Sequence, residues 1–281
     1  MMRDRAGQLT RGLVRASHPA PAAVVTLLAA AMSAALGSGP TTVLVALAVG
    51  TGQLSVGWSN DWIDAARDRA VGRTAKPVVA GLVDDVTLRR CAVAALAVCA
   101  VASLATGVAP GLAHLVAVAS AWAYNAWLKS TPWSWLPYAL SFGLLVVFVV
   151  LAAPGDAVPA TWVVAAAALL GIGAHVANTL PDLDDDAATG VRGLPHRIGR
   201  RASGVLAPAL LVVAAPTVVL GPDGPPEPAA WAAGGIAVLL ALAAGAVALT
   251  RPLSRAPFRL SMAVAACCVV LLALAVPEVA V

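Results

Sequence analysis

The sequence alternates between apolar runs of about 20 residues and short polar connectors, and no other feature limits its fold as strongly. A helix that crosses the hydrocarbon region of a bilayer needs about 20 consecutive, mostly apolar residues. Of the 281 residues, 60% are hydrophobic and only 11% are charged, whereas soluble domains carry about 25% charged residues. Such a chain cannot cover its surface with polar groups, so lipid is its expected solvent.

We therefore predict an all-α integral membrane protein with nine transmembrane helices in a bundle, forming a single domain over residues 1–281. The high Ala, Gly and Val content suits close helix packing in lipid. It is also typical of GC-rich bacterial genomes, which points to a bacterial plasma membrane. The predicted helices span residues 20–37, 40–59, 86–107, 109–127, 133–153, 159–180, 203–220, 229–250 and 257–276.

The distribution of charge predicts the orientation of these helices. Cytoplasmic loops of membrane proteins carry an excess of Lys and Arg. With the N-terminus in the cytoplasm, all 18 Lys and Arg fall in or beside the predicted inside segments, and the outside connectors contain only acidic charges. The same excess of Lys and Arg in cytoplasmic loops explains the net charge of +4. Because the sequence contains no basic helix and no nucleic-acid-binding motif, nucleic acid is not an expected partner. The inside segments are 1–19, 60–85, 128–132, 181–202 and 251–256.

Two acidic clusters stand at the cytoplasmic ends of predicted helices and repeat one pattern. In the first cluster, Asn60, Asp64 and Asp68 are spaced by four residues, and Asp61 follows Asn60 directly. Residues at this spacing lie on one face of a helix. The second cluster repeats the spacing with Asn178, Asp182 and Asp186, although Pro181 interrupts the helix there. The repetition indicates a site built where two halves of the protein face each other.

Carboxylates grouped beside a membrane are costly, because each must be desolvated and like charges repel. A divalent cation removes both costs, and Mg²⁺ binds carboxylate and water oxygens together with substrate phosphates. We therefore predict that Mg²⁺ binds at Asn60, Asp64, Asp68, Asn178, Asp182 and Asp186. Asn60, Asp64, Asp68, Asp182 and Asp186, together with Asp61, form the predicted catalytic set. Ordinary solvated loop acids are the alternative interpretation.

Basic residues follow both acidic clusters and suit the binding of phosphate oxygens. The positive-inside rule alone would also place them there. Many Trp and Tyr residues are expected on the same side, as an interfacial belt or as rings that stabilise an allylic cation. The candidate diphosphate-binding residues are Arg73, Lys76, Lys129, Arg197, Tyr124 and Asn125.

With these motifs, the sequence resembles the UbiA superfamily of intramembrane prenyltransferases. The resemblance rests on an NDxxDxxxD motif at Asn60–Asp68, a DxxxD motif at Asp182–Asp186 and the segment from Gly72 to Gly81. Tyr124 with Lys129 also resembles a Tyr/Lys pair of that superfamily. The resemblance implies a helical bundle around a central cavity, with Mg²⁺-dependent binding of an isoprenyl diphosphate at the cytoplasmic face. It also implies transfer of the prenyl group to a lipophilic acceptor.

One departure from the superfamily pattern bears on the acceptor. Members that prenylate aromatic acids commonly carry an Arg-Pro pair before the first helix, and this sequence has His18-Pro19 instead. Histidine is a poorer anchor for a carboxylate than arginine, so a neutral acceptor is expected, or none. A membrane terpene cyclase, which shares the metal site but needs no acceptor, is the first alternative. A transporter is a remote one, because no charge is expected at mid-membrane. The motifs leave open the prenyl chain length, the product stereochemistry and the oligomeric state.

Overall fold

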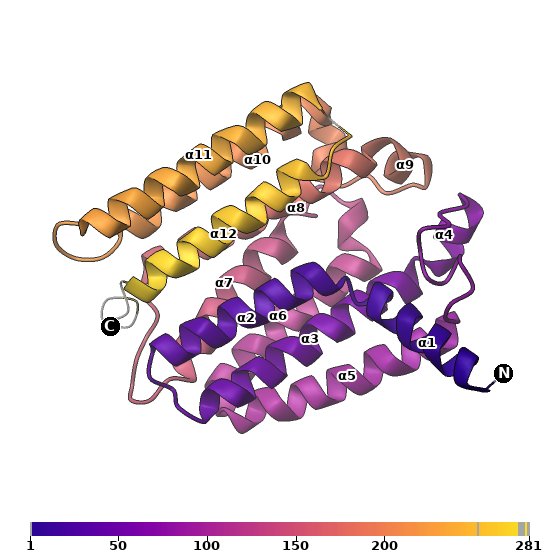
Figure 1. The fold of residues 1–281 in the computed structure, drawn as a ribbon, viewed down its shortest axis with the longest axis horizontal. Helices are drawn as coiled ribbons and strands as arrows, with labels where there is room; N and C mark the ends of the chain where they lie inside the picture. Colours follow the sequence, from indigo (N-terminus) through magenta and orange to yellow (C-terminus); the bar gives the residue numbers. More distant parts are fainter. Residues whose placement is uncertain (1, 252, 275–278, 280–281) are drawn as a thin grey trace.

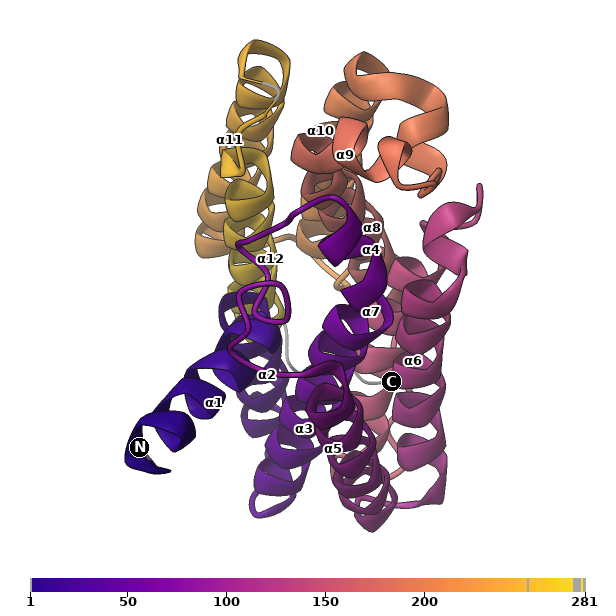
Figure 2. The same ribbon diagram turned by 90° about the vertical axis from the view of Figure 1, so that its right-hand side faces the viewer.

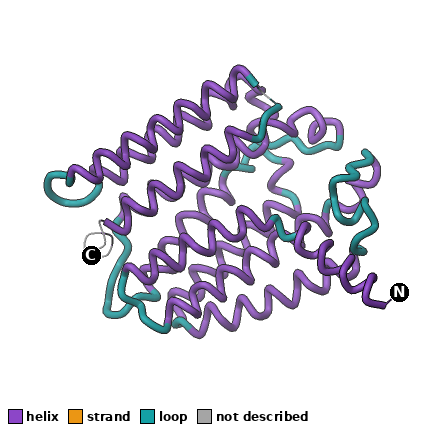
Figure 3. Tube along the Cα trace, viewed as in Figure 1, coloured by secondary structure: helices purple, strands orange, loops and turns teal. Residues whose placement is uncertain are grey.

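The computed structural model describes residues 2–251, 253–274 and 279, and most of these residues lie in helices that are joined by loops (Figures 1 and 3). The predicted all-α architecture is therefore confirmed. Long helices alternate with the short helices α4 and α9 and with two single turns of 3-10 helix, η1 and η2. The bounds are α1 Met2–Ala16, α2 Pro19–Ala35, α3 Thr41–Ile63, α4 Ala65–Ala70, α5 Asp85–Ala105, α6 Val108–Ala126, η1 Leu128–Ser130, α7 Leu136–Leu151, α8 Thr161–Thr179, η2 Leu180–Asp182, α9 Leu183–Ala188, α10 Leu194–Leu220, α11 Pro228–Thr250 and α12 Ala256–Leu274.

Each of the nine predicted apolar segments coincides with one long helix of the structure. They correspond in order to α2, α3, α5, α6, α7, α8, α10, α11 and α12. Within the described residues, five helices are long and apolar enough to cross a membrane, and the bent pair α1–α2 would make a sixth. α7 and α12 are apolar but shorter. A topology of nine spans with a cytoplasmic N-terminus thus stays a prediction.

The long helices pack in chain order and close into a ring. Each helix from α2 to α12, apart from the short α4 and α9, packs on the next, and α12 returns to contact both α2 and α8. A cavity of about 70 Å³ lies inside the ring. Its wall is apolar and is contributed by α2, α7, α8, α10 and α12, with residues such as Val25, Met32, Phe142, Val146, Leu170 and Cys268.

Three segments that were predicted as polar connectors contain helix. The basic N-terminal segment forms α1, which meets α2 at an angle of 63°. The connectors after α3 and α8 contain the short helices α4 and α9. α10 begins at Leu194, ahead of the predicted start at residue 203, and it is broken at Gly199, where φ is 83°. Hydrophobic periodicity missed this first part because it is rich in Arg and lies outside the apolar run.

The short helices mark one end of the bundle. α4 and α9 lie at the end where the N-terminal helix α1 also lies, on the right of Figure 1 and facing the viewer in Figure 2. Because α4 continues α3 and α9 continues α8, both acidic clusters reach this end. The apolar cavity lies deeper in the bundle, between the long helices.

Candidate active site at the end of the bundle

The first acidic cluster lies at the junction of α3 and α4. Asp64 ends α3 and begins α4, and the backbone hydrogen bonds continue across it, from Asp64 N to Asn60 O at 3.0 Å and from Asp68 N to Asp64 O at 2.8 Å. The helical spacing inferred from the sequence is therefore kept through all three residues. The side chains of Asp61, Asp64 and Asp68 are buried, so their charges need partners.

The second acidic cluster lies where α8 ends. Pro181 falls in the 3-10 turn η2, which separates α8 from α9 and disturbs the expected stack of Asn178, Asp182 and Asp186. Asn178 is half-buried on the last turn of α8. Asp182 turns outward to Arg255, which donates to both of its carboxylate oxygens at 3.1 Å. Asp186 on α9 is the residue of this cluster that faces the first motif.

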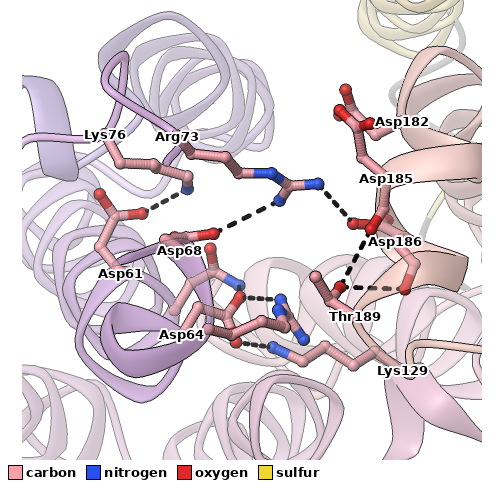
Figure 4. Close-up of polar contacts among 12 residues, drawn as sticks. Asp61, Asp64, Asp68, Arg73, Lys76, Lys129, Asp182, Asp185, Asp186 and Thr189 are labelled. Atoms are coloured by element: carbon pink, nitrogen blue, oxygen red, sulfur yellow. Dashed lines mark hydrogen bonds and ion pairs between the residues drawn. The ribbon is translucent and has the colours of Figure 1, made fainter. Parts of the chain in front are cut away.

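Arg73 joins the two clusters (Figure 4). Its Nη1 lies 3.4 Å from Asp68 Oδ1, and its Nη2 donates to Asp186 Oδ1 at 3.0 Å. Burial lowers the pKa of Arg73, but the hydrogen bond and charge of Asp186 and the charge of Asp68 raise it by more, so the net shift is upward. The pKa of Asp68 is raised, because burial and the charge of Asp64 outweigh the nearby cations Lys76 and Arg73. The site is thus a linked set of charges that spans both halves of the chain.

Lys129 and Arg67 hold Asp64 between them. Lys129 Nζ contacts Asp64 Oδ1, and Arg67 Nη2 lies 2.7 Å from Asp64 Oδ2. Lys129 is buried in the 3-10 turn after α6, and burial lowers its pKa while the Asp64 carboxylate acts in the opposite direction. The turn after α6 therefore delivers one cation to the first acidic motif.

Asp61 contacts a separate pair of side chains, Lys76 and His18. It accepts a hydrogen bond from Lys76 Nζ at 2.7 Å, and its Oδ1 lies 3.1 Å from His18 Nε2. His18 is the only non-glycine residue with positive φ among the described residues, at 51°, and it forms the bend between α1 and α2. The position that departs from the superfamily pattern is therefore tied to the first motif through Asp61.

Asn125 positions Asn60. Its Nδ2 donates to Val56 O at 3.0 Å and to Ser59 Oγ at 2.9 Å, while its Oδ1 accepts from Asn60 Nδ2 at 3.2 Å. These bonds use both donors of the buried amide. The sequence placed Asn125 among the diphosphate-binding residues, which stays a prediction, and the structure places its side chain against Asn60.

An aromatic cluster lies between the acidic site and the apolar cavity. The Tyr124 and Tyr138 rings meet edge to face at 5.1 Å, and His175 packs on Tyr138 with centroids 4.6 Å apart. Gly171 permits this contact, because a Cβ there would lie 2.5 Å from the Tyr138 carbonyl oxygen. Phe142, one turn along α7 from Tyr138, already lines the cavity.

The side chains that lie nearest the acids are not all among the predicted diphosphate-binding residues. Arg197 is exposed and donates to Arg192 O at 3.1 Å, whereas the neighbouring His196 turns inward, with Nε2 3.8 Å from Asp186 Oδ2. The start of α10 up to Gly199 orients these residues. The sequence singled out neither Arg67 nor Arg255 as a partner of the acids. For Arg67, the local indication was its spacing of three residues from Asp64, which allows an ion pair on one helix face.

The donor chemistry of the site fits Mg²⁺. Carboxylate and amide oxygens from both motifs are the ligand type that this ion prefers. Within the described residues, no three His, Cys, Asp or Glu side chains are gathered closely enough to hold a metal ion together. Among the residues of the described site, the four carboxylates Asp61, Asp64, Asp68 and Asp186 are paired with the four cations Arg67, Arg73, Lys76 and Lys129. A diphosphate entering this balanced site would add negative charge that needs added cations.

Solved structures show the same fold. A UbiA homolog from Archaeoglobus fulgidus bound to GPP and Mg²⁺ is 16% identical with a TM-score of 0.72, covering 94% of this chain and 99% of that one. The apo UbiA homolog from Aeropyrum pernix K1 is 22% identical with a TM-score of 0.72, covering 87% and 94%. A digeranylgeranylglyceryl phosphate synthase is 16% identical with a TM-score of 0.69, covering 95% and 98%.

A comparison with curated proteins gave no significant match. Residues 22–266, which include both acidic motifs and most of the helical bundle, match the sequence profile of the UbiA prenyltransferase family. The chain is therefore an integral membrane protein that belongs to the UbiA prenyltransferase family.

Proposed function

We propose that this protein is a Mg²⁺-dependent membrane prenyltransferase that ionises an isoprenyl diphosphate and transfers the prenyl group to a lipophilic acceptor. The observation that carries the proposal is the bridge of Arg73 between Asp68 and Asp186. It brings two acidic motifs from different halves of the chain to one place, at the same end of the bundle toward which the apolar cavity of about 70 Å³ extends through the Tyr124 and Tyr138 cluster. A diphosphate with an apolar tail needs both features, and the related structure from Archaeoglobus fulgidus contains GPP and Mg²⁺.

The residues at the site divide into two proposed roles. Carboxylate and amide oxygens of the two motifs hold the metal, and the cations that now neutralise them turn to the phosphate oxygens when substrate binds. Bound Mg²⁺ supplies charge neutralisation of the diphosphate leaving group. The proposed metal ligands are Asn60, Asp64, Asp68, Asn178, Asp182 and Asp186, and the proposed diphosphate contacts are Arg73, Lys76, Lys129 and Tyr124.

The aromatic cluster extends this scheme toward the cavity. An allylic cation formed at the diphosphate end would lie beside Tyr124 and Tyr138, whose ring faces attract positive charge. The apolar cavity wall excludes water, so the cation is kept for the acceptor rather than hydrolysed. His18, in place of an arginine, favours an uncharged acceptor.

The proposal includes a membrane arrangement. Nine helices over one domain of residues 1–281 would cross a bacterial plasma membrane, with the N-terminus and the active site on the cytoplasmic side. The positive-inside pattern supports this orientation, and so does the position of α1, α4 and α9 at one end of the bundle (Figure 2).

The test uses purified full-length protein, stripped of lipid, with Mg²⁺ and geranyl, farnesyl or geranylgeranyl diphosphate. Organic extracts are analysed by mass spectrometry with and without added phenolic and lipid acceptors. A prenylated acceptor that forms only with the wild type, and not with Asp68→Ala, supports the proposal. A cyclic hydrocarbon formed without an acceptor identifies a terpene cyclase. Full activity of Asp68→Ala would contradict the proposed active site.

A further inference from the structure

His175 is the most buried histidine next to the active site, and half of its hydrogen-bonding capacity is unused. It lies on α8 with 1% of its surface exposed. Its Nε2 lies 3.1 Å from Ser134 Oγ, whereas its Nδ1 is buried without a hydrogen-bond partner. A buried polar atom without a partner is rare in native proteins and calls for an explanation.

Ser134 fixes which nitrogen of His175 carries the proton. The fully buried Ser134 Oγ accepts a hydrogen bond from Leu194 N at 2.8 Å, and its other partner is His175 Nε2. A hydroxyl has one proton to donate. Within the described contacts, the one acceptor in reach of that proton is Nε2, so Ser134 donates to Nε2 and the neutral ring carries its own proton on Nδ1. His175 therefore presents an unused N–H donor.

The position of this donor is informative. His175 packs against both Tyr124 and Tyr138, with ring centroids 5.6 and 4.6 Å away. On one side of His175 along α8, Leu170 lines the apolar cavity. On the other side, beyond the end of α8, Asp186 on α9 faces Arg73. If the diphosphate binds at the acids and the tail lies in the cavity, the reacting carbon of the prenyl group lies at the level of His175.

A second histidine makes this region more polar. Both ring nitrogens of His196 are buried without a hydrogen-bond partner, since its Nε2 is 3.8 Å from Asp186 Oδ2. His196 lies two residues after Leu194, whose backbone N–H donates a hydrogen bond to Ser134 Oγ. Three of the buried side-chain polar atoms without a hydrogen-bond partner in the described structure thus belong to His175 and His196.

We propose that His175 Nδ1–H binds the oxygen of the acceptor substrate, which is an uncharged, lipophilic hydroxyl or carbonyl compound. This inference rests on the proposed transferase function and names its second substrate class. A charged oxygen would be drawn to Arg73, Lys76 and Lys129, whereas a neutral N–H beside two tyrosine rings suits a neutral aromatic oxygen compound. The substrate of a terpene cyclase has no such oxygen at this level.

Two substitutions separate the donor from the Ser134 contact. The amide nitrogen of Asn and the Nδ1 atom of His are both two bonds from Cβ. His175→Asn therefore keeps the N–H donor and loses the hydrogen bond with Ser134. The amide of Gln lies as far from Cβ as Nε2 of His does. His175→Gln therefore keeps the hydrogen bond with Ser134 and loses the N–H donor at the Nδ1 position. His114→Gln is the matched control, because His114 is also a buried histidine with a serine partner, Ser103 Oγ at 2.7 Å, but on α6 away from the acids.

The probes are naphthalene, 1-naphthol and 1-methoxynaphthalene, whose binding to the full-length protein in lipid nanodiscs is measured by tryptophan fluorescence and corrected with empty nanodiscs. The wild type is expected to bind both oxygen-bearing probes about 10-fold more tightly than naphthalene, as one hydrogen bond allows. His175→Gln loses this preference, while His175→Asn and His114→Gln keep it.

The same measurement can overturn the inference. Equal affinity of the wild type for naphthalene and 1-naphthol would contradict the proposed acceptor site. A preference for the oxygen-bearing probes that survives in His175→Gln would contradict it as well. Because binding is measured without turnover, this result is separate from the proposed function. That function fails on its own if the wild type releases no diphosphate from prenyl diphosphates in the presence of Mg²⁺.

Discussion

Arg73 Nη2 donates a 3.0 Å hydrogen bond to Asp186 Oδ1, although 113 residues separate the two in sequence. The same guanidinium lies 3.4 Å from Asp68 on the opposite motif. One side chain from the connector after α4 therefore joins the two halves of the candidate site. The proposed function requires that this cation and its neighbours change partners when diphosphate and metal arrive.

The bridge predicts that arginine is required at position 73. A lysine at this position keeps the charge but, as a point charge without a fork, cannot contact Asp68 and Asp186 together. We expect Arg73→Lys to lower Mg²⁺-dependent diphosphate release about 10-fold. Arg69→Lys is the control on the same segment, because Arg69 forms an exposed pair with Asp85 at 3.4 Å. Equal rates for the two variants would argue against the bridge.

The charge balance of the site predicts that metal and diphosphate bind together. Four carboxylates are already paired with four cations among the described site residues. Binding of Mg²⁺ alone would therefore leave excess positive charge, and binding of a diphosphate alone would leave excess negative charge. We expect the unfolding temperature to rise when Mg²⁺ and a prenyl diphosphate are added together, since ligands that bind the native state stabilise it. Each alone should have little effect, and EDTA should abolish the joint shift. A full shift in EDTA would contradict the proposed role of the metal.

Asn125 is expected to act on metal binding through Asn60. Its Oδ1 accepts from Asn60 Nδ2 at 3.2 Å, so Asn125→Leu frees the amide of Asn60 to rotate. Loss of such supporting contacts typically costs about 10- to 100-fold in metal affinity or activity. Mg²⁺ titrations of diphosphate release should show a higher half-saturating concentration for Asn125→Leu. Ser120→Ala on the same helix, which contacts Ala117 O and Ser141, should titrate as the wild type does.

The sequence predicted those features that depend on local pattern. Nine apolar segments and the spacing of Asn60, Asp64 and Asp68 follow from helical periodicity, and the structure keeps both. Pro181 was the foreseeable weak point of the second motif, and a 3-10 turn does lie there. Such features need no knowledge of which helix packs against which.

Features set by packing between distant segments were not predictable. Arg255 reaches Asp182 across 73 residues, and no pattern near either residue indicates the pair. Arg197 and His196 are adjacent, yet the orientation of the start of α10 turns the arginine outward and the histidine inward. The contact of His175 with Ser134 likewise depends on how α8 meets the turn before α7.

The close approach of α7 and α8 gives a prediction about stability. A Cβ at Gly171 would lie 2.5 Å from the backbone oxygen of Tyr138, which cannot move aside cheaply. Overpacking of this kind costs about 1–3 kcal/mol, so Gly171→Ala should lower the unfolding temperature and displace Tyr138 from His175. Gly235→Ala on α11 is the control, because a Cβ at that position would meet nothing within 4 Å. A Gly171→Ala variant as stable as Gly235→Ala would contradict the packing.

The most direct test of the central claim is the rate of diphosphate release from geranylgeranyl diphosphate with Mg²⁺, compared between Asp68→Asn, Asp186→Asn and Asp85→Asn. If the two motifs form one site, each of the first two variants should lose about 100-fold or more, although they lie on different halves of the chain. Asp85→Asn, whose carboxylate is exposed and paired with Arg69, should keep the wild-type rate. Full activity in either Asp68→Asn or Asp186→Asn would contradict the account.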